Sequence, residues 1–456
     1  MDNVLINGRD NVSVSLETGH KYAVCDISEG DDIIKYGFPI GVAVTDIKKG
    51  EHVHSHNMKT KLGDILSYEY NPHFSVPEKE TPFTVNAFVR ENGDIGIRND
   101  IWIVPTVGCV NSIGKLLSEK TGAIYFSHPY GCSQLGDDMK VTQLILRGLI
   151  KHPNAGGVLV LGLGCENNNI GEMKKILGEI NEDRIKFLNV QDCSDEIAEG
   201  VSLIEELKSK ASCDKRQSVD VSRLKIGLKC GGSDGFSGIT ANAVAGLVTD
   251  RICAMGGSAV LTEVPEMFGA ETVLFERCVD EKVFGKSVEL INNFKMYFKN
   301  HGQPVSENPS PGNKEGGITT LEEKSLGCVQ KGGTAPVTDV ISYGDTVTKP
   351  GLTLLDGPGN DIVSVTNLSA AGCHMVLFTT GRGTPLGGAV PTIKIASNNS
   401  IASRKPHWID FSAFGEKNER AQELLQLIKR VADGEETKNE LLGNREIAIF
   451  KDGVTL

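Results

Sequence analysis

The spacing of hydrophobic and polar positions differs between successive parts of the chain. Residues 1–72 alternate apolar and polar positions in short runs between glycines, which is typical of strands and tight turns in a small β-rich domain. Residues 73–83 are charged and contain proline, so we expect a linker there. In residues 84–215, helical patterns alternate with apolar runs at 102–108, 123–128, 157–164 and 186–192. This alternation predicts a parallel sheet with helices on its faces.

The last part of the chain, residues 224–456, shows the same alternation of apolar runs and helical patterns after a polar stretch at 213–223. A strand reading LKIGLKC precedes a glycine-rich turn and a helix, and a long amphipathic helix is expected over 271–300. Further glycine- and proline-rich loops surround another apolar strand, MVLFTT. The whole pattern therefore predicts a small β domain followed by two α/β domains.

Composition narrows the class of protein. The 456 residues carry a net charge of −12, which argues against a nucleic-acid-binding surface. No apolar run approaches the ~20 residues of a membrane helix, and the start of the sequence has no signal-peptide pattern. We therefore expect a cytoplasmic protein without membrane or nucleic-acid partners, whose 11 cysteines are reduced thiols.

Cysteine or histidine follows each predicted strand of the first α/β domain. The residues concerned are Cys109, His128, Cys132, Cys165 and Cys193, and Cys230 follows the first strand of the next domain. Parallel sheets bind ligands at the carboxyl ends of their strands, so these side chains are placed for chemistry. Cysteine is also a common core residue, and packing alone is the alternative interpretation.

Three histidines stand in the segment GEHVHSHN. On a strand, His52, His54 and His56 would project from one face, where three imidazoles can bind a first-row transition metal. A solvated edge strand with incidental histidines is the alternative.

Glycine-rich loops supply candidate substrate contacts. The loop GGSDGFSG, with Ser233 and Asp234, lies between a strand and a helix, where backbone amides favour an anion such as a carboxylate. Ser233 as a plain helix cap is the alternative. The loop is not GxGxxG, so a dinucleotide site is not expected.

Charged residues in the remaining loops are further candidates. Glu263 and Glu266 in LTEVPEM follow a strand and form a candidate acid/base pair. Asn313 and Lys314 in NPSPGNKEGG, and Arg382 in TTGRGTP, lie in loops where they can meet a negatively charged ligand. Solvated surface residues are the alternative for all of them.

Several long motifs resemble those of the altronate dehydratase family, in the same order and nearly end to end. They include GEHVHSHN, HPYGCSQLGDD, LVLGLGCENN, CGGSDGFSGITAN, LTEVPEMFGAE, ENPSPGNKEGGITTLEEKSLGC and FTTGRGTPLGG. Galactarate dehydratases are close relatives of that family. A more distant relative is a sulfolactate lyase whose small subunit resembles the N-terminal domain. The triple histidine favours the altronate branch.

The resemblance implies an N-terminal SAF-like β-rich domain at 1–72, a Rossmann-like α/β domain at 84–215 and a C-terminal α/β domain at 224–456. It also implies Fe²⁺-dependent dehydration of D-altronate to 2-dehydro-3-deoxy-D-gluconate, a step of hexuronate catabolism. Alternatives are a dehydratase of galactarate or another sugar acid and, from another class, a non-catalytic metal or thiol sensor. A homo-oligomer is compatible with all of these.

For such a dehydration we expect Fe²⁺ near His54 and His56, or near Cys132 and Cys165. An iron–sulfur cluster on Cys109, Cys132 and Cys165 is a minor variant of this hypothesis, because closely spaced cysteine runs are absent. The expected catalytic residues are Glu263 or Glu266 as the base at C2 and His128 as the acid at C3. Arg382, Lys314 and the Ser233–Asp234 loop are expected to hold the carboxylate and hydroxyl groups.

Overall fold

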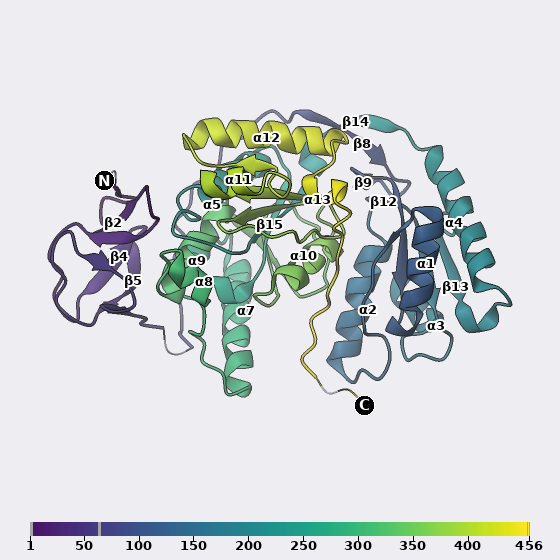
Figure 1. Ribbon diagram of the computed structural model, residues 1–456, viewed down its shortest axis with the longest axis horizontal. Helices are drawn as coiled ribbons and strands as arrows, with labels where there is room; N and C mark the ends of the chain where they lie inside the picture. The colour runs from purple at the N-terminus through teal and green to yellow at the C-terminus, as the bar shows by residue number, and fades with distance from the viewer. Residues whose placement is uncertain (1–2, 63–64, 454, 456) are drawn as a thin grey trace.

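The computed structural model describes residues 3–62, 65–453 and 455, and in it three domains lie side by side (Figure 1). The N-terminal β domain is at one end of the molecule, the C-terminal domain is central, and the middle domain is at the other end. The predicted fold class is confirmed. No helix in the described part of the chain combines the length and apolarity that a bilayer crossing needs.

The N-terminal domain consists of two small antiparallel sheets, ordered β1-β2-β3-β6 and β4-β5-β7. Their strands are β1 (Asn3–Val4), β2 (Val12–Ser15), β3 (Lys21–Ala23), β4 (Asp32–Lys35), β5 (Phe38–Ala43), β6 (His52–Val53) and β7 (Met58–Lys59). The inward-facing side chains of these strands, among them Ile33, Ile40 and Val53, join one apolar core with the C-terminal domain. Docking of this domain therefore buries apolar surface, which stabilises the contact.

The middle domain has a parallel sheet ordered β11-β10-β12-β13. Its elements are β10 (Asp100–Pro105), α1 (Asn111–Thr121), β11 (Ile124–Tyr125), α2 (Asp137–Ile150), β12 (Ala155–Gly162), α3 (Ile170–Leu177), β13 (Ile185–Asn189) and α4 (Glu196–Ser212). Helices α1 and α4 pack on one face of the sheet, and α2 and α3 pack on the other. The strands are buried on both faces, which explains their continuous apolar runs.

The stretch expected only to separate the two α/β domains is structured. Within 213–223, strand β14 (Arg216–Asp220) pairs antiparallel with β8 (Thr84–Val89), which also pairs with β9 (Ile95–Gly96). This ribbon is polar because most of its side chains face solvent, so its composition is that of a loop.

The C-terminal domain is built on a seven-stranded parallel sheet ordered β17-β18-β16-β15-β19-β20-β21. The strands are β15 (Lys225–Cys230), β16 (Ser258–Leu261), β17 (Val337–Ile341), β18 (Gly351–Leu355), β19 (Met375–Thr380), β20 (Thr392–Ala396) and β21 (Phe411–Ser412). The helices are α5 (Ala241–Ala254), α6 (Glu271–Phe275), α7 (Glu281–Asn300), α8 (Pro311–Glu315), α9 (Leu321–Cys328), α10 (Asp361–Ala370), α11 (Asn399–Arg404), α12 (Lys417–Asp433) and α13 (Lys438–Leu441). The single helix expected over 271–300 is thus two helices, α6 and α7.

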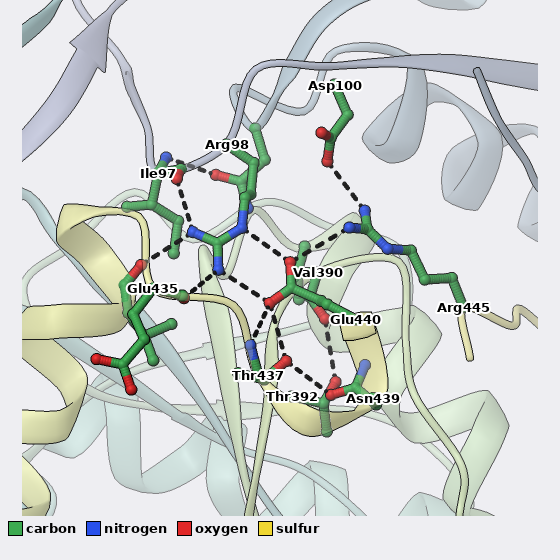
Figure 2. Close-up of polar contacts among 12 residues, drawn as sticks. Ile97, Arg98, Asp100, Val390, Thr392, Glu435, Thr437, Asn439, Glu440 and Arg445 are labelled. Carbon is green, nitrogen blue, oxygen red and sulfur yellow. Dashed lines mark hydrogen bonds and ion pairs between the residues drawn. The ribbon is translucent and has the colours of Figure 1, made fainter. Parts of the chain in front are cut away.

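A buried ion network fixes the middle domain to the C-terminal domain (Figure 2). The Arg98 guanidinium donates to both carboxylate oxygens of Glu440 on α13, at 2.8 and 2.9 Å. Arg445 adds a bond to Glu440 and another, 2.9 Å long, to Asp100 at the start of β10. A two-point arginine–carboxylate contact is strong and directional, so the interface has a fixed geometry.

Candidate active site at the carboxyl edge of the C-terminal sheet

In the C-terminal sheet, the order in which the chain adds strands reverses at β15. From this strand the chain passes to β16 on one side, whereas β19 lies on the other side. Loops that leave neighbouring strands in opposite directions open a crevice at the carboxyl edge, which is where open α/β sheets bind ligands. At this edge the loop after β15 meets the loops after β16, β19 and β20, together with α9.

Glu263 lies at the carboxyl end of β16 in a left-handed backbone conformation, with φ of 68°. Such a conformation costs a non-glycine residue of order 1–3 kcal/mol and persists where surrounding structure enforces it. Its Oε2 is 2.8 Å from Nζ of Lys229, which also lies 2.7 Å from Oδ1 of Asp361. Lys229 is wholly buried inside β15, on the sheet face covered by α10.

Glu266 approaches the opposite face of the same strand. Its carboxylate is 3.1 Å from Nζ of Lys324 and 3.9 Å from Nζ of Lys331, and the Cys230 thiol is within 3.2 Å. Helix α9 supplies Lys324, and the 3-10 helix that follows it, Val329–Gly332, supplies Lys331. Two buried carboxylates thus lie among three buried ammonium groups.

The two glutamates have opposite protonation tendencies. Burial, reinforced by the nearby Glu266 charge, raises the pKa of Glu263 well above its ordinary value, despite the Lys229 contact. Burial also acts to raise the pKa of Glu266, but Lys324 and Lys331 outweigh it and hold that pKa far below its usual range. The pKa values of the two carboxyl groups are therefore displaced in opposite directions, a pattern that is typical of acid/base pairs in active sites.

A pair of cysteines completes this cluster. Sγ of Cys230 lies 3.4 Å from Sγ of Cys328 and 2.7 Å from Nζ of Lys331. The hydrogen bond from Cys328 and the Lys331 charge lower the pKa of Cys230 to about 6, whereas the pKa of Cys328 is raised well above normal by the same hydrogen bond and by burial. Within the described chain, ligand atoms of Cys230, Glu266 and Cys328 lie within 4.8 Å of one another. The surrounding lysines oppose binding of a cation there.

The glycine-rich loop is held by its own hydrogen bonds. Asp234 accepts bonds from Ser237, Ser397 and Asn398, so its carboxylate stabilises the junction between the loops after β15 and β20. Asn313 caps α8 and donates to the Ser233 carbonyl at 2.8 Å. The polar atoms of Asp234 and Asn313 are thus engaged within the protein, and their contact with substrate stays a prediction.

Two expected cations lie at the rim of this region. Arg382, about half exposed, bonds Glu315 at 3.0 Å and the Gly312 carbonyl at 3.2 Å. Lys314 is exposed, and its carbonyl oxygen lies 3.0 Å from Nε2 of His54. The loop 231–238, α8 and the N-terminal domain therefore meet at one place.

The N-terminal domain covers the carboxyl edge. Lys21 and Lys35 each place Nζ 2.8 Å from the Glu323 carboxylate on α9, and all three side chains are 1% exposed. Tyr36 from this domain and Ser237, Lys324 and Cys328 from the C-terminal domain line a cavity of about 10 Å³ between them, alongside other side chains. Such a volume holds about one water molecule, so little space remains between the N-terminal domain and α9.

The histidine prediction needs one correction and one addition. Only His52 lies in a strand, because the side chain of Asn57 bonds the backbone of His52 and His54 and closes a turn over 54–57. The rings still lie close together: the ring centroids of His54 and His56 are 5.5 and 5.6 Å from that of His52. The missed member is His20, whose Nδ1 is 3.0 Å from Nε2 of His52. Burial, mainly, lowers the pKa of His52 to about 4, so this imidazole is neutral.

The middle-domain candidates lie elsewhere. Cys132 and Cys165 are exposed in loops after β11 and β12 of the middle domain. The N-terminal domain, which carries the histidines, lies at the opposite end of the molecule from the middle domain (Figure 1). The sulfurs of these two residues and Cys109 do not all lie within 4.8 Å of one another in the described structure.

His128 is also in the middle domain, and its role as acid partner of the glutamates is corrected. The ring is buried, and Nε2 lies 2.8 Å from the Pro105 carbonyl while Nδ1 accepts from the Tyr130 amide. Burial lowers the pKa of His128. With both nitrogens bonded to backbone in another domain, this imidazole is not available to Glu263 or Glu266.

Comparisons with known proteins agree with this layout. The description "Altronate/galactarate dehydratase SAF domain" matches residues 3–61, "D-galactarate dehydratase/Altronate hydrolase, second domain" matches 87–212, and "D-galactarate/Altronate dehydratase, C-terminal" matches 221–455. The chain belongs to the D-galactarate/altronate dehydratase family. Among this family's curated members, it is similar to altronate dehydratase of Bacillus subtilis, with 52% identity over 100% of this chain and 98% of the relative.

Two further family members give the range of similarity. The altronate dehydratase of Escherichia coli is 50% identical over 98% of this chain and 94% of its own length. The L-threo-forming galactarate dehydratase of the same organism is 30% identical over 95% of this chain and 89% of its own length. The altronate enzymes are thus markedly more similar to this chain than the galactarate enzyme.

Sequence reasoning missed the buried cations of the site. A signal existed for Lys229, because a lysine inside a strand that is apolar on both faces needs a buried partner. Lys324 and Lys331 carried a weaker signal in the sequence, because α9 has charges typical of a surface helix although its residues are all buried. Their role follows from tertiary contacts with Glu266.

Proposed function

We propose that this protein is a hydro-lyase that dehydrates D-altronate to 2-dehydro-3-deoxy-D-gluconate. Its similarity to two altronate dehydratases along almost their whole length supports the substrate. The observation that carries the chemistry is the pair Glu263 and Glu266, whose pKa values are displaced in opposite directions at the edge of the parallel sheet.

The reaction removes a proton from C2 and a hydroxide from C3, and the resulting enol becomes a ketone. Both steps are difficult near neutral pH, since the C2 proton is weakly acidic beside a carboxylate and hydroxide is a poor leaving group. A positioned base and acid each contribute typically 10²–10⁴-fold to such a reaction. We assign Glu266, whose pKa is lowered, as the base at C2 and Glu263, whose pKa is raised, as the acid at C3.

The lysines of the cluster suit an anionic substrate. Lys324 lines the closed cavity, where its ammonium group can meet the substrate carboxylate and the enolate charge that develops beside it. A six-carbon acid does not fit a cavity of about 10 Å³. Substrate binding therefore requires the N-terminal domain to move away from α9 and to close again, which excludes water from the charged groups.

Iron, which the family resemblance implies, fits the histidine cluster best. The 3.0 Å separation of the His20 and His52 nitrogens is short enough for both to contact one ion, and imidazole suits Fe, Zn or Ni. We propose that His20 and His52 supply two of the ligands. No three nitrogens of His20, His52, His54 and His56 lie within 4.8 Å of one another in the described residues, so His54 or His56 would join them only after a rearrangement. A divalent ion bound there would act as a Lewis acid toward a substrate oxygen.

The first experiment measures keto-deoxy acid formation from D-altronate and from galactarate by protein purified without oxygen, with added Fe²⁺ or with a chelator. We expect Fe²⁺-dependent turnover of altronate. Turnover of galactarate alone would replace the substrate, and no turnover of either acid with any metal would refute the dehydratase proposal.

Single variants test the acid/base assignment. Glu263→Gln and Glu266→Gln should each lower kcat by about 10²-fold or more, because each removes one proton-transfer group. Glu423→Gln, on the exposed face of α12, is the matched control and should be as active as the wild type. Wild-type turnover in either active-site variant would remove that residue from the mechanism.

A further inference from the structure

The proposed acid/base chemistry does not use the buried cysteine pair, Cys230 and Cys328. Cys230 ends β15 and Cys328 ends α9, 98 residues apart in the chain, yet their sulfurs are 3.4 Å apart. A disulfide needs about 2.05 Å between sulfurs, so the two sulfurs would have to approach each other by roughly 1.4 Å. Both residues are almost wholly buried, 1% and 3% exposed, so solvent plays little part in setting their state.

The two sulfurs are chemically unequal. Lys331 lies 2.7 Å from Sγ of Cys230 and favours the thiolate, whereas Cys328 keeps its proton and donates toward that thiolate. One thiolate beside one thiol is the state in which an oxidised sulfur is captured at once by its neighbour. The half-buried Cys253 and the buried Cys373 differ, because desolvation raises the pKa of each to about 12 and disfavours the reactive thiolate.

A route for a small oxidant exists at the same place. The closed cavity between the N-terminal domain and α9 is lined by Cys328 and has room for about one water molecule. Hydrogen peroxide is only slightly larger than water. Opening of the N-terminal domain, which substrate binding also requires, would expose the pair further.

We propose that Cys230 and Cys328 form a reversible disulfide that switches this site off under oxidising conditions. In the first step the Cys230 thiolate attacks hydrogen peroxide, the O–O bond breaks, and a sulfenic acid and hydroxide form. In the second step the Cys328 sulfur attacks the sulfenic sulfur, the S–S bond forms, and the leaving hydroxide takes the Cys328 proton as water. The first hydroxide takes a proton from solvent, so two thiols and one peroxide give one disulfide and two waters.

The disulfide would disable the site in two ways. Lys331 loses its thiolate partner, which changes the charge balance around Glu266. In addition, α9 becomes covalently tied to β15, and α9 carries both Lys324 and the Glu323 contact that docks the N-terminal domain. The effect on turnover rests on the proposed function, whereas formation of the disulfide does not.

The test treats wild-type protein with hydrogen peroxide, with and without prior metal removal by a chelator, and then alkylates the remaining thiols. Mass spectrometry of the digest should find the peptides of Cys230 and Cys328 cross-linked, two alkylated thiols fewer, and full reversal by a phosphine reductant. Turnover should fall in proportion to the cross-linked fraction and return with the reductant without added Fe²⁺.

Variants separate the switch from other damage. Cys328→Ser should lose reductant-reversible inhibition, and Cys213→Ser, which alters an exposed cysteine, should keep it. Absence of the cross-link in peroxide-treated, folded wild-type protein would overturn the proposal, and this measurement needs no variant. A cross-link in a protein without dehydratase turnover would leave the dithiol chemistry intact and refute only the proposed function.

Discussion

Glu323 is the residue on which docking of the N-terminal domain most depends. Its carboxylate is wholly buried between Lys21 and Lys35. Burial acts to raise its pKa, but these two ammonium groups outweigh it and lower the pKa from 4.5 to about 2. At 1.36 kcal/mol per pKa unit, the ionised carboxylate stabilises the docked state by about 3 kcal/mol at neutral pH. Removing one partner of a buried ion pair typically costs 3–5 kcal/mol, which agrees.

The perturbation is Glu323→Gln, which keeps the shape of the side chain and removes its charge. A loss of about 3 kcal/mol should increase local opening about 100-fold, since 1.4 kcal/mol is a factor of ten. Hydrogen exchange followed by mass spectrometry at pH 7 should show this acceleration in peptides covering 15–35 and 317–328. The control is Glu315→Gln, whose exposed ion pair with Arg382 is worth at most about 1 kcal/mol.

The pH dependence follows from the sign of the shift. Because the pKa of Glu323 is lower in the folded protein, the unfolded state binds more protons, and the stabilisation is complete above the ordinary value of 4.5. It is lost as the pH falls toward 2. The difference in protection between wild type and Glu323→Gln should therefore shrink over this range. Equal protection of the two proteins at pH 7 would refute the reasoning.

Three further outcomes test other parts of the structure. Glu440→Gln should destabilise the protein by about 3–5 kcal/mol in urea unfolding, because it leaves the buried Arg98 without its charged partner, and an unchanged midpoint would contradict this. Gly235→Ala should accelerate exchange in the N-terminal domain, since the added methyl group would collide with the Gly19 carbonyl; wild-type exchange would show that the contact is loose. His20→Asn should weaken Fe²⁺ binding measured by calorimetry, and unchanged affinity would place the metal elsewhere.

The sequence was sufficient to predict the layered fold. Apolar runs separated by helical patterns identified the four strands of the middle-domain sheet and β15, β16 and β19 of the C-terminal sheet, because strands buried on both faces cannot tolerate regular polar positions. The sequence also drew attention to Glu263 and Glu266, since both follow a strand directly in the chain. Features that depend on the local order of residues along the chain could thus be predicted from the sequence.

Features that depend on contacts between residues far apart in the chain could not be predicted from the sequence. His20 joins the histidine cluster only because β3 pairs with β6, which sets Tyr22 opposite His52. Lys331 reaches Cys230 through the packing of the segment after α9 against β15. Conversely, Asp234 looked like a ligand-binding residue in a glycine-rich loop, but donors from its own loop and from the loop after β20 converge on its carboxylate. Sequence spacing cannot distinguish a carboxylate that organises loops from one that contacts substrate.

The linker at 73–83 acquires a role from the way the N-terminal domain docks. The ion contacts that hold this domain involve α9 and not the linker. The linker, whose residues His73 and Glu80 bond the C-terminal domain through their backbone amides, keeps the released domain at an effective concentration on the order of millimolar. Each opening for substrate is therefore followed by rapid recapture. If a protease cut the linker, the N-terminal domain would dissociate at low protein concentration. The fraction of protein in the closed state would then depend on the protein concentration.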